Sequence, residues 1–189
     1  MKAVIFDLFG VVCEEIGRPW LHRSVPETDQ KRVHEEYFVR GDLGTIEEQD
    51  FFDGLAAASG QDAHAIRDEW HAAIREAPGM FALVERIRGK HPVALCTNAS
   101  RWFFESVEEK VRLRERFDVV VVSAEQGVVK PGKDIYERTC ALLNVAPEEA
   151  VFVDDRPENV EGAVAAGLSG ILFTGTEVLE KELAELGVA

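Results

Sequence analysis

The chain has 189 residues, a hydrophobic fraction of 46% and a formal net charge of −14, so it can bury a core but offers no basic surface to nucleic acid. No apolar run reaches the length of a membrane span, and the N-terminal stretch does not resemble a signal peptide. Its three cysteines are widely spaced, which favours reduced thiols in a cytoplasmic protein over a disulfide framework or a zinc site. The sequence leaves open whether the protein is a monomer or a homodimer.

Near the N-terminus, Val4, Ile5 and Phe6 form an apolar run that ends at Asp7 and is followed by Gly10. A run without polar alternation is typical of a strand buried on both faces of its sheet. Open parallel sheets bind their ligands at the carboxyl ends of the strands, which is where Asp7 lies. Asp7 is therefore either an acidic residue in an ordinary turn or a catalytic or metal-binding carboxylate, and this stretch alone favours neither.

No second buried strand is predicted between residues 14 and 78, where the pattern is helical. One helix is expected over residues 27–39. Thr45 and Glu48 have the spacing of a capping box, which predicts that Thr45 caps a second helix. Asp62 is expected to cap a third helix. Together these predictions give a small helical unit between the first strand and the rest of the chain.

From residue 78 onward, apolar strands alternate with helices, a pattern that predicts βαβ units and a mostly parallel sheet. Pro157 at the first turn and Gly167 past the end are the usual punctuation of one of these helices. With the first strand, five strands are expected. The later strands are predicted over residues 92–96, 119–122, 150–153 and 171–173, and the helices over residues 80–88, 101–116, 133–143, 157–166 and 176–186.

Polar and charged residues lie at or just beyond the predicted strand ends. They are Asp7, Thr97, Asn98, Lys130, Asp154 and Asp155. In a parallel sheet these ends share one edge, where up to three carboxylates would repel one another unless a cation lay among them. Oxygen ligands of this kind suit Mg²⁺, which often also binds a phosphate of the substrate. A hydroxyl, backbone N–H groups and one lysine provide the donors and the positive charge that a phosphoryl group needs.

Four segments resemble the motifs of the haloacid dehalogenase (HAD) superfamily of hydrolases and phosphatases, in that family's order. They are residues 6–12 (FDLFGVV), 95–98 (LCTN), 129–131 (VKP) and 151–163 (VFVDDRPENVEGA), the last continuing through Ala166-Gly167-Leu168. The resemblance implies an α/β fold, a Rossmann-like parallel five-stranded sheet of order 5-4-1-2-3 flanked by helices, with a small helical cap inserted after strand one. It implies a catalytic core of residues 1–13 and 79–189 and a cap of residues 14–78. The short chain and cap look most like the small sugar-phosphate phosphatases.

The activity that this resemblance implies is hydrolysis of a small phosphorylated metabolite, a sugar phosphate being one option. Asp7 would be the nucleophile that forms an aspartyl-phosphate. Lys130 would steady both Asp7 and the phosphate, and Thr97 and the backbone of Asn98 would hold the phosphoryl oxygens. The resemblance therefore implies a Mg²⁺-dependent phosphatase.

The metal ligands come from the same resemblance. Mg²⁺ would be bound directly by Asp7, by Asp155 and by the backbone carbonyl of Phe9. Asp154 would bind it through a water molecule.

Phe9 departs from the family pattern. Family phosphatases usually have a second aspartate two residues after the nucleophile, acting as general acid and base, and a phenyl ring cannot carry a proton. The departure predicts a preference for esters whose leaving group departs unaided. It leaves two alternatives open: a metal-independent 2-haloacid dehalogenase, and a catalytically weak relative that binds a phosphorylated ligand or a partner protein. The Asp154-Asp155 pair favours the metal-dependent phosphatase.

Four further residues in or beside the predicted cap are candidates for contact with the substrate. They are Arg18, Trp20, His22 and Arg40. Tryptophan in such a position is more often part of a core, and arginine more often lies at the surface. We therefore expect mainly structural roles for these four side chains.

Overall fold

The computed structural model describes residues 1–188; residue 189, the end of the predicted core, lies outside the described residues. At its centre is a sheet of parallel strands, β1 (Ala3–Phe6), β2 (Val93–Thr97), β3 (Val119–Val122), β4 (Ala150–Asp154) and β5 (Ser169–Leu172). The strands lie in the order β3-β2-β1-β4-β5, which confirms the predicted order. Phe6 pairs with Leu95 of β2 and with Val153 of β4, so Asp7 follows the middle strand.

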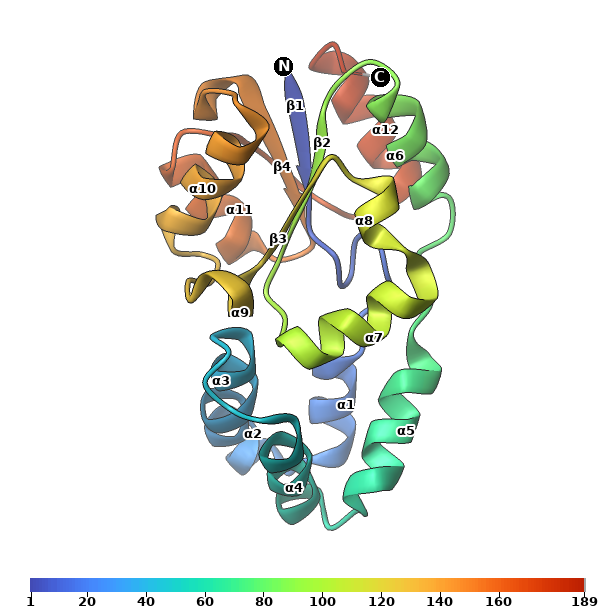
Figure 1. Cartoon of the computed structure of the whole chain (residues 1–189), viewed down its shortest axis with the longest axis vertical. Helices are drawn as coiled ribbons and strands as arrows, with labels where there is room; N and C mark the ends of the chain where they lie inside the picture. The colour runs from blue at the N-terminus through green and yellow to red at the C-terminus, as the bar shows by residue number, and fades with distance from the viewer. Residues whose placement is uncertain (189) are drawn as a thin grey trace.

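Helices cover both faces of the sheet, because successive side chains of a strand point to opposite faces. Ile5 packs into one cluster with Ile135 of α10, whereas Phe6 lies in the other cluster with Leu83 of α6. Figure 1 shows α10 and α11 on one side of the sheet and α6, α8 and α12 on the other. The helices that follow residue 78 are α6 (Met80–Arg88), α7 (Arg101–Val111), α8 (Leu113–Arg116), α9 (Ser123–Gln126), α10 (Lys133–Leu143), α11 (Pro157–Ala165) and α12 (Thr176–Glu185).

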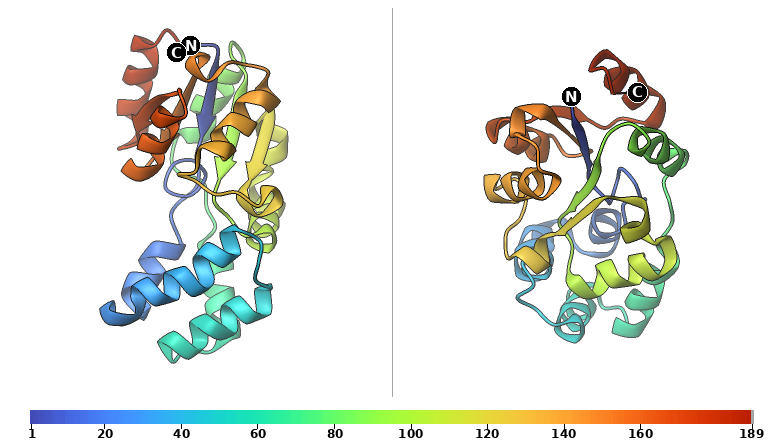
Figure 2. Two further views of the ribbon diagram at one scale, coloured as in Figure 1. Left: turned by 90° about the vertical axis from the view of Figure 1, so that its left-hand side faces the viewer. Right: turned by 45° about the horizontal axis from the view of Figure 1, so that its top comes forward.

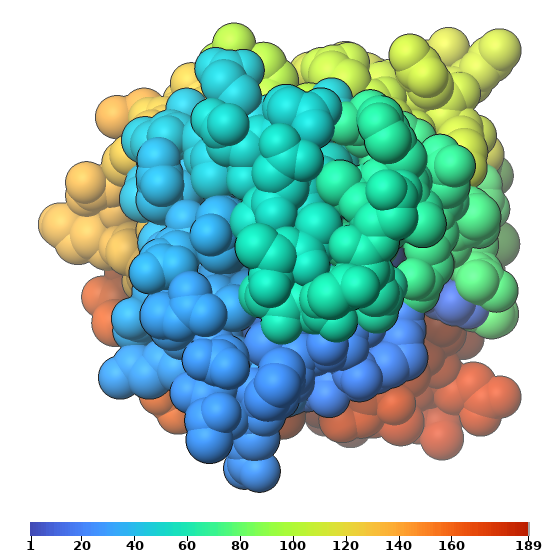
Figure 3. Space-filling view, turned by 90° about the horizontal axis from the view of Figure 1, so that it is seen from below, coloured from blue at the N-terminus to red at the C-terminus, as the bar shows by residue number. Residues whose placement is uncertain are grey.

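A helical unit, residues 14–78, lies between β1 and β2 in the chain. It sits beyond the carboxyl ends of the strands, away from both termini (Figures 1 and 2). Seen from that end, its blue-to-green surface fills the centre of the view (Figure 3). It comprises α1 (Gly17–Ser24), α2 (Glu27–Val33), a π-helical turn (His34–Phe38), α3 (Val39–Asp42), α4 (Glu48–Ser59) and α5 (Ala63–Ala73). The unit therefore covers the edge of the sheet where the predicted site residues lie.

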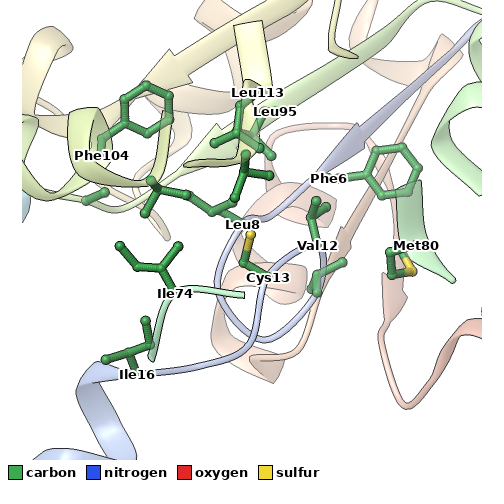
Figure 4. Close-up of a cluster of buried hydrophobic side chains, with 14 of the residues drawn as sticks. Phe6, Leu8, Val12, Cys13, Ile16, Ile74, Met80, Leu95, Phe104 and Leu113 are labelled. Carbon is green, nitrogen blue, oxygen red and sulfur yellow. The ribbon is translucent and has the colours of Figure 1, made fainter. Parts of the chain in front are cut away.

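Two extended segments join this helical unit to the sheet. The amide of Glu14 donates to the carbonyl of Arg75 at 3.1 Å, and the amide of Ala77 donates to the carbonyl of Val12 at 2.9 Å. The loop after β1 is also anchored through apolar side chains, since Leu8 lies in the core close to Leu95 and Leu113 (Figure 4). The backbone around Asp7 is therefore held between the sheet and a packed core.

The predicted capping box at Thr45 is wrong. The hydroxyl of Thr45 donates to the carbonyl of Arg40 at 3.2 Å, which closes the turn after α3. Helix α4 begins at Glu48, and its N-cap residue Glu47 accepts no capping hydrogen bond through its side chain. By contrast, Asp62 accepts a hydrogen bond from the amide of Ala65 at 3.0 Å, which confirms that cap.

Other element boundaries also differ from the prediction. The helix expected over residues 101–116 is broken at Arg112, whose φ of 56° ends α7 before α8 begins. The helix expected over residues 27–39 is interrupted by the π-helical turn. Helix α1 was not predicted, because Gly17 and Pro19 interrupt the helical pattern of its sequence. The last strand begins two residues earlier than expected, at Ser169.

Within residues 1–188, the structure has no helix with the length and hydropathy needed to cross a membrane. The cytoplasmic location stays a prediction. The choice between a monomer and a homodimer also stays open.

Candidate active site

Asp7 lies at the carboxyl end of the middle strand and is almost fully buried, with 6% of its surface exposed. Its amide donates to the carbonyl of Val153 at 2.9 Å, which continues the pairing of β1 with β4. The amide of Leu8 donates to its Oδ1 at 2.7 Å. The sheet therefore fixes both the backbone and the carboxylate of Asp7.

Lys130 bridges two buried carboxylates. Its Nζ lies 2.7 Å from Oδ1 of Asp7 and 2.7 Å from Oδ2 of Asp154. Burial lowers the pKa of Lys130, but the two carboxylates raise it by more, so the ammonium group keeps its charge. Burial raises the pKa of Asp7, Lys130 opposes that rise and Asp154 adds to it.

The side chain of Asn98 holds the loop that carries Lys130. Its Nδ2 donates to the carbonyl of Lys130 at 3.0 Å, and its Oδ1 accepts from the amide of Lys130 at 2.8 Å. These two bonds tie the loop after β2 to the loop after β3. The predicted role of Asn98 concerned its backbone, so this function of its side chain was missed.

Both carboxylate oxygens of Asp154 accept hydrogen bonds from other residues of the protein. Besides Lys130, its carboxylate accepts from the amide of Arg156 at 2.9 Å and from Nδ2 of Asn159 at 3.0 and 3.1 Å. A carboxylate with this many donors serves to position its neighbours. Asn159 was not among the predicted site residues, although its place in the fourth motif could have suggested it.

Asp155 is the more open of the two acids. Its Oδ2 lies 2.5 Å from the guanidinium of Arg18. Its Oδ1 is buried and has no hydrogen-bond partner among the described residues. Gly10, with a φ of +87°, lies so close that a Cβ there would be 2.7 Å from the Asp155 carboxylate. The chain thus leaves room for this acid and leaves one of its oxygens free.

The three acids are close enough to hold a metal ion. One oxygen from each of Asp7, Asp154 and Asp155 lies within 4.8 Å of the others. The carbonyl of Phe9 accepts no hydrogen bond from the rest of residues 1–188. Free carboxylate and carbonyl oxygens are ligands that Mg²⁺ prefers. The donor set therefore fits Mg²⁺, and the ligand roles stay predictions.

Thr97 lies at the end of β2, next to the strand that carries Asp7. It is completely buried, yet its hydroxyl has no partner in the described part of the chain. Buried hydroxyls are normally hydrogen-bonded, so this one is available to a bound group. That arrangement suits the predicted contact with a phosphoryl oxygen.

A pocket opens over Asp7 between the sheet edge and the helical unit. Its polar part includes Asn98, Lys130 and Arg156. Its other part is an aromatic wall, in which Phe9 stacks on Phe103 with ring centroids 5.6 Å apart. The aromatic wall consists of Phe9, Phe38, Phe51, Trp70, Trp102 and Phe103.

The four candidates from the helical unit have different positions. Arg18 lines the pocket and pairs with Asp155, while 35% of its side chain remains exposed, and its contact with a substrate stays a prediction. Trp20 is buried in the core, as expected. His22 binds the side chain of Gln30, and Arg40 donates to a backbone carbonyl; neither lines the pocket over Asp7.

Comparison with known proteins places the chain in a family. The family model of haloacid dehalogenase-like hydrolases matches residues 1–167. The chain therefore belongs to the haloacid dehalogenase-like hydrolases, and it is an enzyme of that class.

Two curated relatives have names that state their activity. A sesquiterpene phosphatase of Aspergillus oryzae is 27% identical, and the match covers 98% of this chain and 96% of that protein. A flavin mononucleotide hydrolase of Arabidopsis thaliana is 26% identical, over 82% of this chain. The match covers 64% of the Arabidopsis protein, so this chain spans less than two thirds of it.

Solved structures share the fold. A HAD family enzyme of Bacteroides thetaiotaomicron has a TM-score of 0.81 at 20% identity, and the match covers 96% of this chain and 98% of that one. Another structure of that enzyme, in complex with magnesium and inorganic phosphate, has a TM-score of 0.73 at 20% identity and covers 90% and 93% of the two chains. At this identity, the likeness establishes the fold alone.

Proposed function

We propose that this protein is a Mg²⁺-dependent phosphatase that hydrolyses a small phosphorylated compound through an aspartyl-phosphate on Asp7. The observation that carries the proposal is the buried cluster in which Lys130 lies 2.7 Å from both Asp7 and Asp154. In this proposal residues 14–78 are a cap over a core of residues 1–13 and 79–189.

Each residue of the cluster has a separate task in this reaction. Asp7 attacks the phosphorus atom, and Lys130 places its positive charge beside the attacking carboxylate and the phosphoryl group. The free hydroxyl of Thr97 donates to a phosphoryl oxygen, as does the backbone of Asn98. Donors that are fixed in place before the reaction stabilise the charge that develops in its transition state.

The oxygens of Asp7, Phe9 and Asp155 would hold Mg²⁺, with Asp154 acting through water. When bound, the ion would neutralise the acids and the phosphoryl group so that they can approach one another. A magnesium and phosphate complex of the Bacteroides thetaiotaomicron enzyme supports this choice of metal.

The aromatic wall supports an apolar or planar organic group on the substrate. Aromatic side chains bury apolar surface well but give few partners to hydroxyl groups, which cost free energy when buried without hydrogen bonds. The names of the Aspergillus and Arabidopsis relatives, a sesquiterpene phosphatase and a flavin mononucleotide hydrolase, support the same choice. The sugar phosphate suggested by the sequence stays a prediction.

Turnover of p-nitrophenyl phosphate with and without a chelator tests the proposal. We expect the chelator to abolish turnover and Asp7→Asn to lower kcat by at least about a thousandfold, because the nucleophile is lost. Acid-quenched wild-type protein should carry a phosphate that hydroxylamine removes. Asp68→Asn, an exposed change on α5, is the matched control.

Two results would overturn this proposal. Phosphate release at the wild-type rate by Asp7→Asn would remove Asp7 from the reaction. Release of chloride from 2-chloropropionate in the presence of the chelator would instead identify the metal-independent dehalogenase.

A further inference from the structure

Hydrolysis of a phosphate ester needs a proton donor as well as a nucleophile. The oxygen that leaves the phosphorus atom must be protonated unless the leaving group is very acidic. The loop after β1 has Phe9 at the position where an acid would be expected, and its ring is stacked on Phe103. The proton must therefore come from elsewhere in the pocket.

Two acids besides Asp7 line the pocket, Glu15 and Asp42. The carboxylate of Glu15 accepts from the amides of Ile16 and Gly17 at 3.0 and 3.1 Å, and it pairs with Arg18 at 3.1 Å. The carboxylate of Asp42 has no hydrogen bond or ion pair with any of residues 1–188. Asp42 is thus the acid in the pocket that is not already occupied by protein donors.

The backbone of Asp42 is fastened to the core. Ser123 donates its hydroxyl to the carbonyl of Asp42 at 2.6 Å and accepts a hydrogen bond from the amide of Ala99 at 3.1 Å. Gly44 lies so close to the core that a Cβ there would be 2.7 Å from the carbonyl oxygen of Ala124. These contacts hold the end of α3 against α9, and Ser123 links both to the loop that follows Thr97.

We propose that Asp42 is the acid–base residue of this enzyme, supplied by the helical unit in place of the acid that Phe9 replaces. The inference rests on the proposed phosphatase function. It assigns a catalytic role to a residue outside the four motifs.

With Asp42 in this role, the bonds and protons are accounted for in both steps of the hydrolysis. In the first, Asp7 bonds to phosphorus, the bond from phosphorus to the ester oxygen breaks, and that oxygen takes the proton of the Asp42 carboxylic acid and leaves as an alcohol. In the second, the Asp42 carboxylate takes a proton from water as the water oxygen bonds to phosphorus. The bond from phosphorus to Asp7 breaks, inorganic phosphate leaves, and both side chains return to their first state.

The surroundings of Asp42 raise the fraction of the free enzyme in which this carboxyl group is protonated near neutral pH. Burial raises the pKa of Asp42 to about 7, Lys130 and Arg156 oppose the rise, and Glu15 adds to it. An acid–base residue works best when its pKa lies near the working pH.

His34 also lines the pocket, but its charge state differs. Burial lowers the pKa of His34, and Arg156 and Arg18 lower it further while Glu35 opposes them. Its imidazole is therefore mainly neutral at pH 7. A neutral imidazole is a poor proton donor to a leaving oxygen, which leaves Asp42 as the better acid.

The test compares wild type with Asp42→Asn on benzyl phosphate and p-nitrophenyl phosphate. Both substrates present a ring to the aromatic wall, but only benzyl alkoxide needs protonation to leave. We expect kcat/KM for benzyl phosphate to fall about 10²–10⁴-fold and kcat/KM for p-nitrophenyl phosphate to stay within about threefold. With p-nitrophenyl phosphate the variant should show a burst, because hydrolysis of the aspartyl-phosphate loses its base.

The pH profile and a rescue variant provide independent readouts. Wild-type kcat/KM for benzyl phosphate should fall as the pH rises through about 7, where Asp42 loses its proton, and Asp42→Asn should lack this limb. Phe9→Asp in the Asp42→Asn background should restore part of the benzyl phosphate activity. Asp68→Asn, whose side chain is exposed on α5, should match wild type throughout.

Three outcomes would overturn the inference. If Asp42→Asn keeps wild-type activity on benzyl phosphate, another group donates the proton. If Asp42→Asn loses activity on both esters equally, and Phe9→Asp restores activity on neither, Asp42 has a structural role. If the wild type hydrolyses neither ester with Mg²⁺ present, the proposed phosphatase function itself fails, and this inference with it.

Discussion

Lys130 carries the positive charge that lies between two buried carboxylates. It is 4% exposed, and the acids on either side of it, Asp7 and Asp154, are also buried. Removing one member of a buried ion pair leaves an uncompensated charge, which costs more than the pair itself contributes. Loss of Lys130 should therefore destabilise the fold as well as impair the proposed chemistry.

Lys130→Gln should lower the free energy of unfolding by about 3–5 kcal/mol at pH 7, because two buried carboxylates lose their counter-ion. Urea denaturation followed by circular dichroism measures this change. Lys133→Gln is the matched control, since Lys133 is exposed and its one ion pair within residues 1–188 is with Glu137 on the same helix. Equal stability of the two variants would contradict this account of the cluster.

The sequence predicted which residues gather at the sheet edge, but not all of their partners. Asp7 and Lys130 could be found because they lie at or beyond apolar runs and within known motifs. Arg18 was a candidate for contact with the substrate, but its pairing with Asp155 could not be predicted, because it joins residues 137 positions apart. Asp42 was missed for the same reason: its place in the pocket depends on how α3 packs against the core.

Helix α11 packs unusually closely against the loop that carries Lys130. A Cβ at Gly162 would lie 2.5 Å from the carbonyl oxygen of Pro131. Backbone atoms cannot move aside as the end of a side chain can. Glycine is therefore required here by the neighbouring loop, although it is a poor residue for the interior of a helix.

Gly162→Ala tests this requirement, because helix propensity and packing predict opposite signs. Alanine should stabilise an isolated helix by about 1 kcal/mol, whereas the clash should destabilise the protein by about 1–3 kcal/mol. We expect the clash to win and kcat to fall as Lys130 shifts. Thermal unfolding and steady-state kinetics measure both effects. Glu161→Ala, an exposed neighbour on α11, should change neither, and a more stable Gly162→Ala variant would show that the loop yields.

Element boundaries were predictable where local signals are strong. Asp62 caps α5 as expected, because an aspartate before a helix satisfies free backbone amides. The break at Arg112 was not predictable, since a left-handed conformation there carries no glycine signal. Thr45 has a capping pattern, but its hydroxyl donates to the carbonyl of Arg40, so the turn after α3 takes the group that the pattern assigned to α4.

The sheet was predicted because fully buried strands leave apolar runs in the sequence, such as Ala3–Phe6 of β1. The order of the strands could not be predicted in this way, because the alternation of strands and helices does not specify it. The predicted order came instead from the resemblance of four motifs to one family. The relation of the helical unit to the sheet also depends on packing between distant segments. Sequence patterns therefore defined the layers, and family resemblance defined their arrangement.

Binding of Mg²⁺ should stabilise the whole molecule, because the ligands come together only in the folded chain. At a free concentration about 100 times Kd, the midpoint of thermal unfolding should rise by about 5–10 °C. Differential scanning fluorimetry with and without Mg²⁺ measures this shift. Asp155→Asn should reduce it strongly, and Asp68→Asn should retain it. No shift in the wild type would contradict a metal site formed by these acids.

The middle position of β1 has a consequence for how the protein is made. This strand leaves the ribosome before the other four strands of the sheet, and its partners β2 and β4 begin only at Val93 and Ala150. Until they are synthesised, both edges of a wholly apolar strand lack their native neighbours, a state prone to aggregation. The growing chain should therefore depend on chaperones until β4 emerges. In the proposed reaction Asp7 needs Asp155, so no nascent fragment that ends before residue 155 should be active.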